Sequence, residues 1–501
     1  MEKLIKSAGQ IEERPEEHES AEHRIRLEKV EKLRALGIDP WPQPPEEITA
    51  QSTKVIEEFV EGEERSYCLA GRLMAIRLHG KTAFAQLHDG AGKIQLYIRN
   101  DVVGTERFEQ FEKLIDLGDI LFVRGTVFRT KTGEITLKVV SYLLLSKCLY
   151  PLPEKFHGLQ DIEVKYRQRY LDLMTSEASR DRFVKRSLII TQMRSYLHSH
   201  GYLEVETPML HPIAGGAAAK PFITHHNALH SDFYLRIAPE LYLKRLLVGG
   251  FERVYEINRN FRNEGISTKH NPEFTMLEFY TAYKDYHFSM DFVEDMLRTI
   301  VQAVCGLLEV SYAESVLDFG SPFKRISVHN AVIEYAGIGT EDLTEEKIDT
   351  TLRTHGVTTK GHSLGEKVYA LFDALVESKL IQPTFVYGLP LEVSPLTKRD
   401  PENPSQAPRY EFFIAGMELA NSYNELNDPF DQASRFQEQV AAHAAGDEEA
   451  HHYDTDFIRA LEYGLPPAVG VGIGIDRLVM VLTNTPSIKE VILFPTLKKK
   501  Q

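Results

Sequence analysis

Apolar and polar residues alternate with a period of two along five short runs in the first third of the chain. The runs are Leu69–Arg77, Thr82–Asp89, Lys93–Arg99, Ile120–Arg129 and Ile135–Leu145. Glycine-containing turns separate them, and a helix-prone stretch, Glu106–Asp116, lies between the third and the fourth. Such alternation marks strands with one buried face, and five short strands with one intervening helix fit an OB-fold barrel. We therefore predict an OB-fold domain over residues 61–150.

Residues 1–60 carry a helical pattern instead. Apolar residues within Glu19–Leu36 fall on one side of a helix, at Ile25, Leu27, Val30, Leu33 and Leu36. Gly37 and Pro40 would end this helix, and a stiff, proline-rich connector follows. We predict an amphipathic helix that lays its apolar stripe on the next domain. An arm that guides RNA is less favoured, because acidic residues balance the basic ones.

Residues 151–180 are predicted as a linker, and residues 181–501 as one large domain. Arg180–Gly201 has the spacing of a long amphipathic helix. It leads into a strand over residues 202–210, which Pro208 stops.

Two hairpins are expected in the large domain. Val254–Ile257 and Phe274–Tyr280 would pair across a polar loop, and residues 409–414 would pair with residues 417–425. Antiparallel strands interspersed with helices predict an α+β domain, with a mostly antiparallel sheet flanked by helices. We expect about residues 310–395 to be an insertion without chemistry of its own.

Composition and charge narrow the function classes. The 501 residues are 43% hydrophobic, which allows a large core in two or three domains. A net charge of −15 argues against a protein that coats nucleic acid nonspecifically, although a local basic face for one RNA stays open. Three cysteines without a CxxC pair indicate a reducing cytoplasm. Without a long apolar run or a signal-like N-terminus, we expect a soluble, unexported protein.

The loop of the first hairpin combines residue types that suit a nucleotide. Arg262 ends the first strand and Phe274 begins the second. A guanidinium supplies a planar fork of donors for phosphate oxygens, and a phenyl ring supplies a flat apolar surface for a base. Taken singly, Arg262 and Glu264 could be a solvated pair and Phe274 a core residue.

A glycine-rich strand at residues 470–474 enters a helix through Asp476 and Arg477. It looks like a dinucleotide fingerprint, but Ile475 replaces the last glycine and no acidic residue follows about twenty positions later in a βαβ context. We therefore do not expect a dinucleotide site.

Together these segments resemble the class II aminoacyl-tRNA synthetases. The stretch from Arg262 to Phe274 resembles motif 2, the helix and strand ending at Pro208 resemble motif 1, and the junction at Asp476 and Arg477 resembles motif 3. The run Arg236–Tyr242 resembles the lysyl-tRNA synthetase family in particular, in its bacterial form with a short N-terminal region. The resemblance covers the chain from about residue 65 to its end.

The resemblance implies a lysine–tRNA ligase that activates lysine with ATP. Arg262 would bridge the α-phosphate and the amino-acid carboxylate, and Phe274 and Arg477 would sandwich the adenine. With Arg262 and Arg477 as the catalytic pair, the implied ATP-binding residues are Arg262, Glu264, His270, Asn271, Phe274, Glu411 and Arg477. Glu411 and Glu418 would hold Mg²⁺, which prefers carboxylate and phosphate oxygens. Without the resemblance, both would be taken for surface acids.

Free lysine carries two ammonium groups and one carboxylate, so its pocket needs an excess of negative charge. The implied lysine-binding residues are Gly216, Glu240, Arg262, Glu278, Tyr280, Asn421, Tyr423 and Glu425. We place Glu278, Glu425 and Tyr280 at the ε-ammonium, Glu240 and Gly216 at the α-amine, and Asn421 with Arg262 at the carboxylate. An aspartyl- or asparaginyl-tRNA ligase on the same scaffold would need a cation or an amide there.

In this family the barrel holds the anticodon of the tRNA, and four residues here match its contacts: Arg77, Phe84, Gln95 and Glu134. Phe84 would stack on a base and Gln95 would read a base edge, although the strand pattern alone allows Phe84 to be core. The implied partners are tRNA(Lys), ATP, L-lysine and a second copy of the chain, with no membrane.

Two further alternatives are weaker. A truncated paralogue that lysylates a translation factor would lack the barrel domain. A non-catalytic RNA-binding relative would not need to keep Arg262, Glu411, Glu418 and Arg477.

Overall fold

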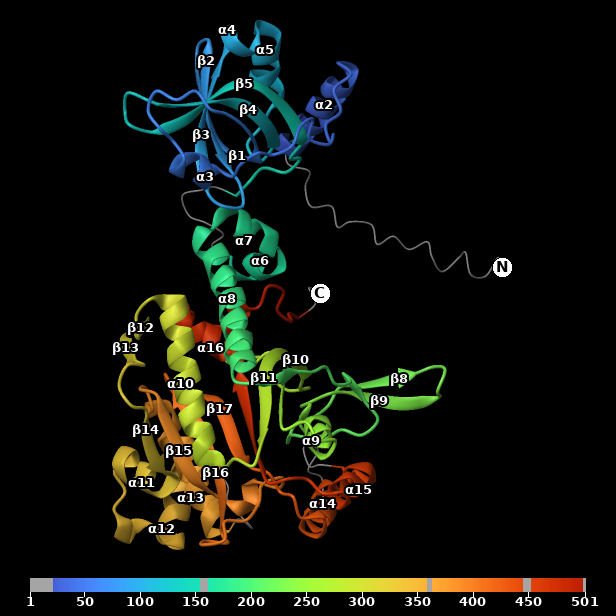
Figure 1. Cartoon of the computed structure of the whole chain (residues 1–501), viewed down its shortest axis with the longest axis vertical. Helices are drawn as coiled ribbons and strands as arrows, with labels where there is room; N and C mark the ends of the chain where they lie inside the picture. Colours follow the sequence, from blue (N-terminus) through green and yellow to red (C-terminus); the bar gives the residue numbers. More distant parts are fainter. Residues whose placement is uncertain (1–20, 154–160, 358–362, 445–451, 499–501) are drawn as a thin grey trace. The chain divides into compact units, whose positions relative to one another are not determined.

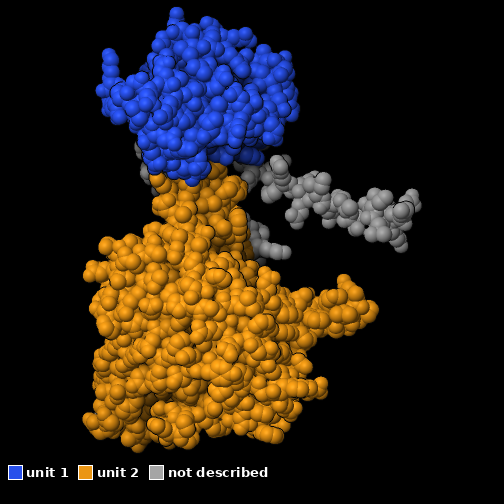
Figure 2. Space-filling view, in the orientation of Figure 1, with its two compact units in different colours: residues 1–158 blue, residues 159–501 orange. Residues whose placement is uncertain are grey.

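The computed structural model describes residues 21–153, 161–357, 363–444 and 452–498. The chain divides into two compact units, residues 1–158 and residues 159–501 (Figure 2). Of the linker expected at 151–180, residues 154–160 lie outside the described residues. Along the described helices, none combines the length and the apolar content needed to cross a membrane.

The first unit contains the predicted five-stranded barrel. Its strands pair in the order β1-β2-β3-β5-β4, and β4 pairs with β1, which closes the ring. They are β1 (Ser66–His79), β2 (Thr82–His88), β3 (Lys93–Arg99), β4 (Ile120–Arg129) and β5 (Ile135–Ser146). The accompanying helices are α3 (Ser52–Glu57), α4 (Asn100–Val103) and α5 (Thr105–Leu114). Inward residues such as Leu69, Leu96 and Val139 form one apolar core, which confirms the OB-fold prediction.

The N-terminal helix, α2 (Ala21–Ala35), forms as expected but buries a different side. Val30 and Leu33 are buried, whereas Ile25, Leu27 and Leu36 are exposed, so the predicted apolar stripe is wrong at three positions. Instead Arg26 is 4% exposed and donates to the backbone carbonyls of Leu117, Cys148 and Tyr150 at 3.0–3.2 Å. The helix is therefore attached partly through hydrogen bonds from the Arg26 guanidinium to backbone carbonyl oxygens. A pattern of apolar residues cannot predict such an attachment.

The second unit is built on an eight-stranded sheet in the order β14-β15-β16-β17-β18-β11-β10-β6. Among the described residues, five of its seven pairings are antiparallel, which confirms the prediction. The strands are β6 (Leu203–Glu204), β10 (Arg253–Phe261), β11 (Glu273–Ala282), β14 (Lys324–Ser327), β15 (Thr384–Pro390), β16 (Gln406–Ile414), β17 (Met417–Asn424) and β18 (Ala468–Gly474).

Helices cover one face of this sheet. Figure 1 shows α10 running along the strands, and the helices on this face are α8 (Glu177–Ser199), α10 (Tyr286–Cys305) and α16 (Ile475–Leu482). Leu277 and Phe279 of β11 point into this core. Successive side chains of a strand point to opposite faces, so Glu278 and Tyr280 face the other side of the sheet.

The other side carries α9 (Glu240–Val248), α14 (Pro429–Ala444) and α15 (Thr455–Glu462), which share a smaller core with Tyr280. A separate sheet joins β7 (Leu210–His211), β9 (Ser231–Leu235) and β8 (Ile223–His226). The strand expected at residues 202–210 is therefore reduced to β6 and β7, because the segment between them leaves the sheet before Pro208, which has no amide hydrogen to donate.

Two expectations about segments outside the motifs are wrong. Residues 162–175 are not a linker but form two helices, α6 (Ile162–Arg167) and α7 (Arg169–Thr175). The side chain of Arg169 is fully buried and attaches them to the segment around α17 (Ile488–Val491). It donates hydrogen bonds to the backbone carbonyls of Lys489, Ile492 and Leu493. The region 310–395 is only partly an insertion, because β14 and β15 belong to the main sheet. Its remaining elements are β12 (Glu309–Tyr312), β13 (Ser315–Asp318), α11 (Val328–Ala331), α12 (Glu345–Thr354) and α13 (Leu364–Leu375).

Candidate active site

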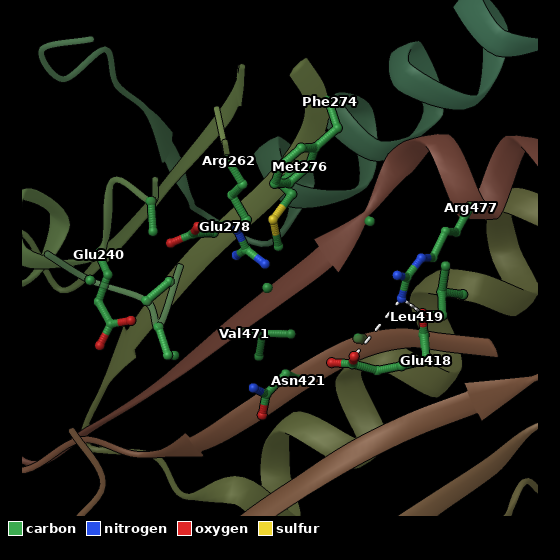
Figure 3. Close-up of a pocket in the computed structure, with 18 of the residues that line it drawn as sticks. Glu240, Arg262, Phe274, Met276, Glu278, Glu418, Leu419, Asn421, Val471 and Arg477 are labelled. Atoms are coloured by element: carbon green, nitrogen blue, oxygen red, sulfur yellow. Dashed lines mark hydrogen bonds and ion pairs between the residues drawn. The ribbon is translucent and has the colours of Figure 1, made fainter. Parts of the chain in front are cut away.

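A pocket of about 390 Å³ opens on the face of the sheet opposite α10, a size that suits a small molecule. The middle strands β11, β17 and β18, the start of α9, the loop after β10 and residues 393–397 form its wall. The predicted site residues that line it are Gly216, Glu240, Arg262, Glu264, His270, Asn271, Phe274, Glu278, Tyr280, Glu418, Asn421, Tyr423, Glu425 and Arg477. Figure 3 shows Glu240 and Glu278 towards one end and Glu418 and Arg477 towards the other.

The floor of the pocket is the glycine-rich strand β18. Gly470 lies between Tyr280 of β11 and Tyr423 of β17, and Gly472 lies between Glu278 and Asn421. A Cβ atom on Gly470 would come within 2.2 Å of Glu425 Oε1 and 2.5 Å of the Tyr280 ring. The glycines therefore leave room for side chains from both neighbouring strands to lean over β18, which gives the motif a packing role.

One end of the pocket gathers three buried carboxylates, from Glu240, Glu278 and Glu425. Burial, reinforced by the charge of Glu240, raises the pKa of Glu278 to about 8. Burial also raises the pKa of Glu425 to about 8, against the opposing effect of Lys244. Tyr423 donates to Glu240 Oε1 at 2.6 Å. A cation that enters this end would stabilise the ionised form of these carboxyl groups, which burial alone disfavours.

Lys244, which the sequence reasoning missed, lies behind these acids and has no exposed surface. Its Nζ lies 2.6 Å from Glu240 Oε1 and also forms an ion pair with Glu425 Oε2. Burial disfavours its charge, but the two glutamates hold the pKa of Lys244 above its ordinary value. The spacing of Glu240 and Lys244, four residues apart on one helix, was a readable signal for the pair.

Arg262 lies between the acidic end and the end lined by His270 and Arg477 (Figure 3). Burial lowers the pKa of its guanidinium, and its Nε has no hydrogen-bond partner among the described residues. Its guanidinium carbon stands 5.1 Å from the centre of the Phe274 ring. A half-buried guanidinium whose buried Nε is an unused donor is suited to an anionic ligand.

Arg477 is fixed from two sides at the far end. Its Nη1 donates to the backbone carbonyl of Glu418 at 2.5 Å, and its Nη2 lies 3.1 Å from His270 Nε2. Burial, together with the neighbouring Arg477 and Lys269, lowers the pKa of His270. A neutral ring leaves this end dominated by the charges of Arg262, Lys269 and Arg477, so the end favours an anion.

Asn271 lines the pocket but is committed to the fold. Its side chain donates to the carbonyl of Glu273 at 2.6 Å and accepts from the Thr496 amide at 3.2 Å. Glu264 lies exposed on the loop. The predicted contacts of both residues with ATP stay predictions.

Glu411 is the predicted site residue that does not line the pocket. It is buried and accepts from Arg409 Nη2 at 2.7 Å and from the Tyr369 hydroxyl at 3.0 Å. Burial, opposed by Arg409, raises its pKa to about 7. Tyr369 belongs to α13, in the region to which we assigned no chemistry, and Arg409 also donates to Asn421 Oδ1 at 3.0 Å. Both residues were missed.

The carboxylates fit Mg²⁺ only in part. Glu418 is partly exposed at the pocket and offers hard oxygen ligands, whereas Glu411 is already paired. Among the described residues, no group of three or more acidic, histidine or cysteine side chains could hold a metal. Mg²⁺ is commonly held by one or two carboxylates together with phosphate oxygens, which suits this donor set.

On the barrel, the four predicted anticodon residues lie on the outer side of neighbouring strands or in the adjoining turn. Arg77 pairs with Phe84, and Phe84 with Tyr97, across β1, β2 and β3. The Phe84 and Tyr97 rings stack with centroids 4.7 Å apart, so Phe84 is not core. Gln95 donates to Glu134 at 2.9 Å. Tyr97, two residues after Gln95 and so on the same face, was readable from the alternation but missed.

The family model of the class II tRNA synthetases (D, K and N) matches residues 161–498, and that of the OB-fold nucleic acid binding domain matches residues 67–145. The chain is 54% identical to the lysine–tRNA ligase of Moorella thermoacetica, over 95% of this chain and 98% of that protein. It is 53% identical to that of Syntrophomonas wolfei, over 95% and 97%, and 50% identical to that of Listeria monocytogenes, over 95% and 97%. The chain therefore belongs to the class II aminoacyl-tRNA synthetases, and within them to the family of the lysine–tRNA ligases.

Proposed function

We propose that this enzyme activates L-lysine with ATP to lysyl-adenylate and pyrophosphate, and then transfers lysine to the 3′ end of tRNA(Lys). The observation that carries the proposal is the convergence of Glu240, Glu278 and Glu425 on one end of a pocket that holds Arg262 farther along. An amino acid with two ammonium groups and one carboxylate matches that distribution of charge. The side chain of an aspartate or asparagine substrate would face these three acids, where it would need a cation or an amide.

In the first step an oxygen of the lysine carboxylate bonds to the α-phosphorus of ATP, and pyrophosphate leaves. Arg262 is placed to hold the carboxylate and the α-phosphate together, because its guanidinium is half-buried with an unused donor. Holding reactants in line and stabilising developing charge can supply most of the acceleration in such a transfer. Phe274 and Arg477 supply an apolar face and a cation for the adenine.

Glu418, with Glu411 behind it, would hold Mg²⁺. Bound there with ATP, Mg²⁺ would supply positive charge that offsets the charge of the phosphates. Arg409 and Tyr369 fix the orientation of Glu411.

In the second step a ribose hydroxyl at the tRNA end attacks the lysyl carbonyl, and AMP leaves. The barrel face around Phe84 would bind the anticodon by stacking and by edge contacts to Gln95. The enzyme would act in the cytoplasm as a homodimer, as the resemblance of residues 180–210 to motif 1 implies.

ATP–pyrophosphate exchange with each of the twenty amino acids tests the proposal. We expect exchange above background with lysine alone, because the acidic end discriminates by charge. Exchange that depends on aspartate or asparagine and not on lysine would overturn the specificity. No exchange with any amino acid, from folded protein that still binds ATP, would favour a non-catalytic relative.

A further inference from the structure

Lys244 is a buried cation placed among the residues that face the pocket. Its ammonium lies 2.6 Å from Glu240 and forms an ion pair with Glu425, and both partners line the pocket although Lys244 does not. Its Nζ also stands 5.6 Å from the centre of the Tyr423 ring. Lys244 therefore touches the pocket only through the residues that form its wall.

The balance of charge around Lys244 changes what the acids can offer a ligand. Once all three are ionised, Glu240, Glu278 and Glu425 would present three negative charges, and Lys244 cancels one of them. The two that remain equal the two ammonium groups of free lysine, while the lysine carboxylate faces Arg262. Buried charges are costly unless they are compensated, so this balance matters most in a closed site.

We propose that Lys244 is a positioning residue for the amino-acid substrate: an internal ammonium that pairs with Glu240 and Glu425 and orients both carboxyl groups, and so sets the acidic end to accept two ammonium groups and no more. The inference rests on the proposed lysine activity. It assigns to Lys244 no contact with the substrate, and its effect on binding is carried by the two glutamates.

The proposed role of Lys244 can be distinguished from a purely structural one by the pH dependence of lysine binding. The groups in contact with Lys244 are Glu240 on its own helix, and Glu425 and Tyr423 at the end of β17. Glu278 and Tyr280 of β11 line the same pocket as these partners, with Tyr280 donating weakly to Glu278 at 3.4 Å. Without the ammonium, Glu425 would hold its proton to a higher pH, since an opposite charge within about 4–6 Å lowers a carboxyl pKa by about 1–3 units. Lysine binding would then need a higher pH.

Lys244→Met tests this, because it removes the charge and keeps much of the volume. In ATP–pyrophosphate exchange between pH 6.5 and 9, the KM for lysine should rise about tenfold or more at pH 7 and approach the unaltered enzyme's value towards pH 9. The kcat and the KM for ATP should change much less. Lys244→Gln, which keeps a hydrogen-bond donor for Glu240, carries the same expectation if the methionine variant does not fold.

Lys147→Met is the matched control. Lys147 is likewise buried between two carboxylates, of Asp116 and Asp119, but in the first unit, so its loss should leave the lysine KM and its pH profile unchanged. A folded Lys244 variant with the unaltered pH profile, or with a lysine KM raised equally at every pH, would overturn the inference. Failure of the unaltered enzyme to use lysine would instead overturn the proposed function.

Discussion

The two ends of the pocket are built in opposite ways. At the acidic end, Glu240 and Glu425 are buried, paired with Lys244 and attached to a helix and a sheet. At the other end, Glu264 and His270 sit on a loop, and Arg262, between the two ends, keeps a buried Nε without a partner among the described residues. The ammonium groups of lysine would thus bind to carboxyl groups whose positions are already fixed by the fold. The phosphates of ATP would bind to donors that have no partner yet in the described part of the chain.

The largest effect is expected from removing the arginine that would bind the phosphates of ATP. Arg262→Ala should lower the rate of lysine-dependent exchange by about 10³-fold or more, because an arginine that stabilises charge in phosphoryl transfer is worth that much. The measurement is kcat/KM for lysine and for ATP, and both should fall. Arg259→Ala is the control, since Arg259 lies on β10 three residues before Arg262, is partly exposed, faces Glu273 and does not line the pocket. Equal losses in the two variants would refute a specific role for Arg262.

A smaller effect should follow from altering the acidic end alone. Glu425→Gln leaves Lys244 with only Glu240 as a charged partner, and we expect a loss of about 2–3 kcal/mol, roughly 30- to 150-fold in the KM for lysine. The KM for ATP should stay within about twofold, because the change lies away from Arg477.

Glu294→Gln provides the matched comparison for that variant. Glu294 is a buried acid on α10, across the sheet, where it pairs with Arg298. Its loss should leave both KM values unchanged. An increase in the KM for ATP as large as that for lysine in Glu425→Gln would show that the two ends are not separable.

The smallest effect is expected near pH 8, where the affinity for lysine begins to depend on pH and only the acidic end of the pocket is responsible. Glu278 and Glu425 have pKa values of about 8 in the empty pocket, so each must lose a proton before it can pair with an ammonium group. The affinity for lysine should therefore fall about tenfold for each pH unit below 8 and for each proton involved. Calorimetry in buffers of different ionisation enthalpy should show proton release on lysine binding and none on ATP binding at the same pH.

The same shifts affect stability with a defined sign. In the unfolded chain these carboxyl groups ionise near their ordinary pKa of 4.5, whereas in the fold they stay protonated up to about pH 8. The empty enzyme should lose stability as the pH rises through that window, and saturating lysine should raise Tm more at pH 8 than at pH 6.5. A Tm increase from lysine that does not depend on pH would contradict the assigned pKa values.

Regular patterns made the sheet predictable, whereas most of the pocket residues were expected only from the resemblance to the synthetase family. Glu278 and Tyr280 are two apart on a strand, which placed both on one face before any coordinates were known. The buried position of Lys244 was not predicted because a lysine in an amphipathic helix is usually solvent-exposed. That of Arg26 was not predicted because its partners are backbone carbonyls distant in sequence. The setting of Glu411 depends on Tyr369, from a segment without a recognisable motif. Contacts between distant polar groups leave no periodic trace in a sequence.

The absence of side chains at Gly470 and Gly472 of β18 has a consequence for changing the substrate of the enzyme. Since Gly470 and Gly472 carry no side chains, the side chains that reach over this strand come from the neighbouring strands β11 and β17, and Glu240 of α9 and Arg262 complete the pocket. An engineer seeking a different amino-acid substrate could exchange side chains on β11 and β17 while leaving the central strand untouched. Adding even one methyl group to Gly470 would displace two neighbours at once, so that position is the poorest place to begin.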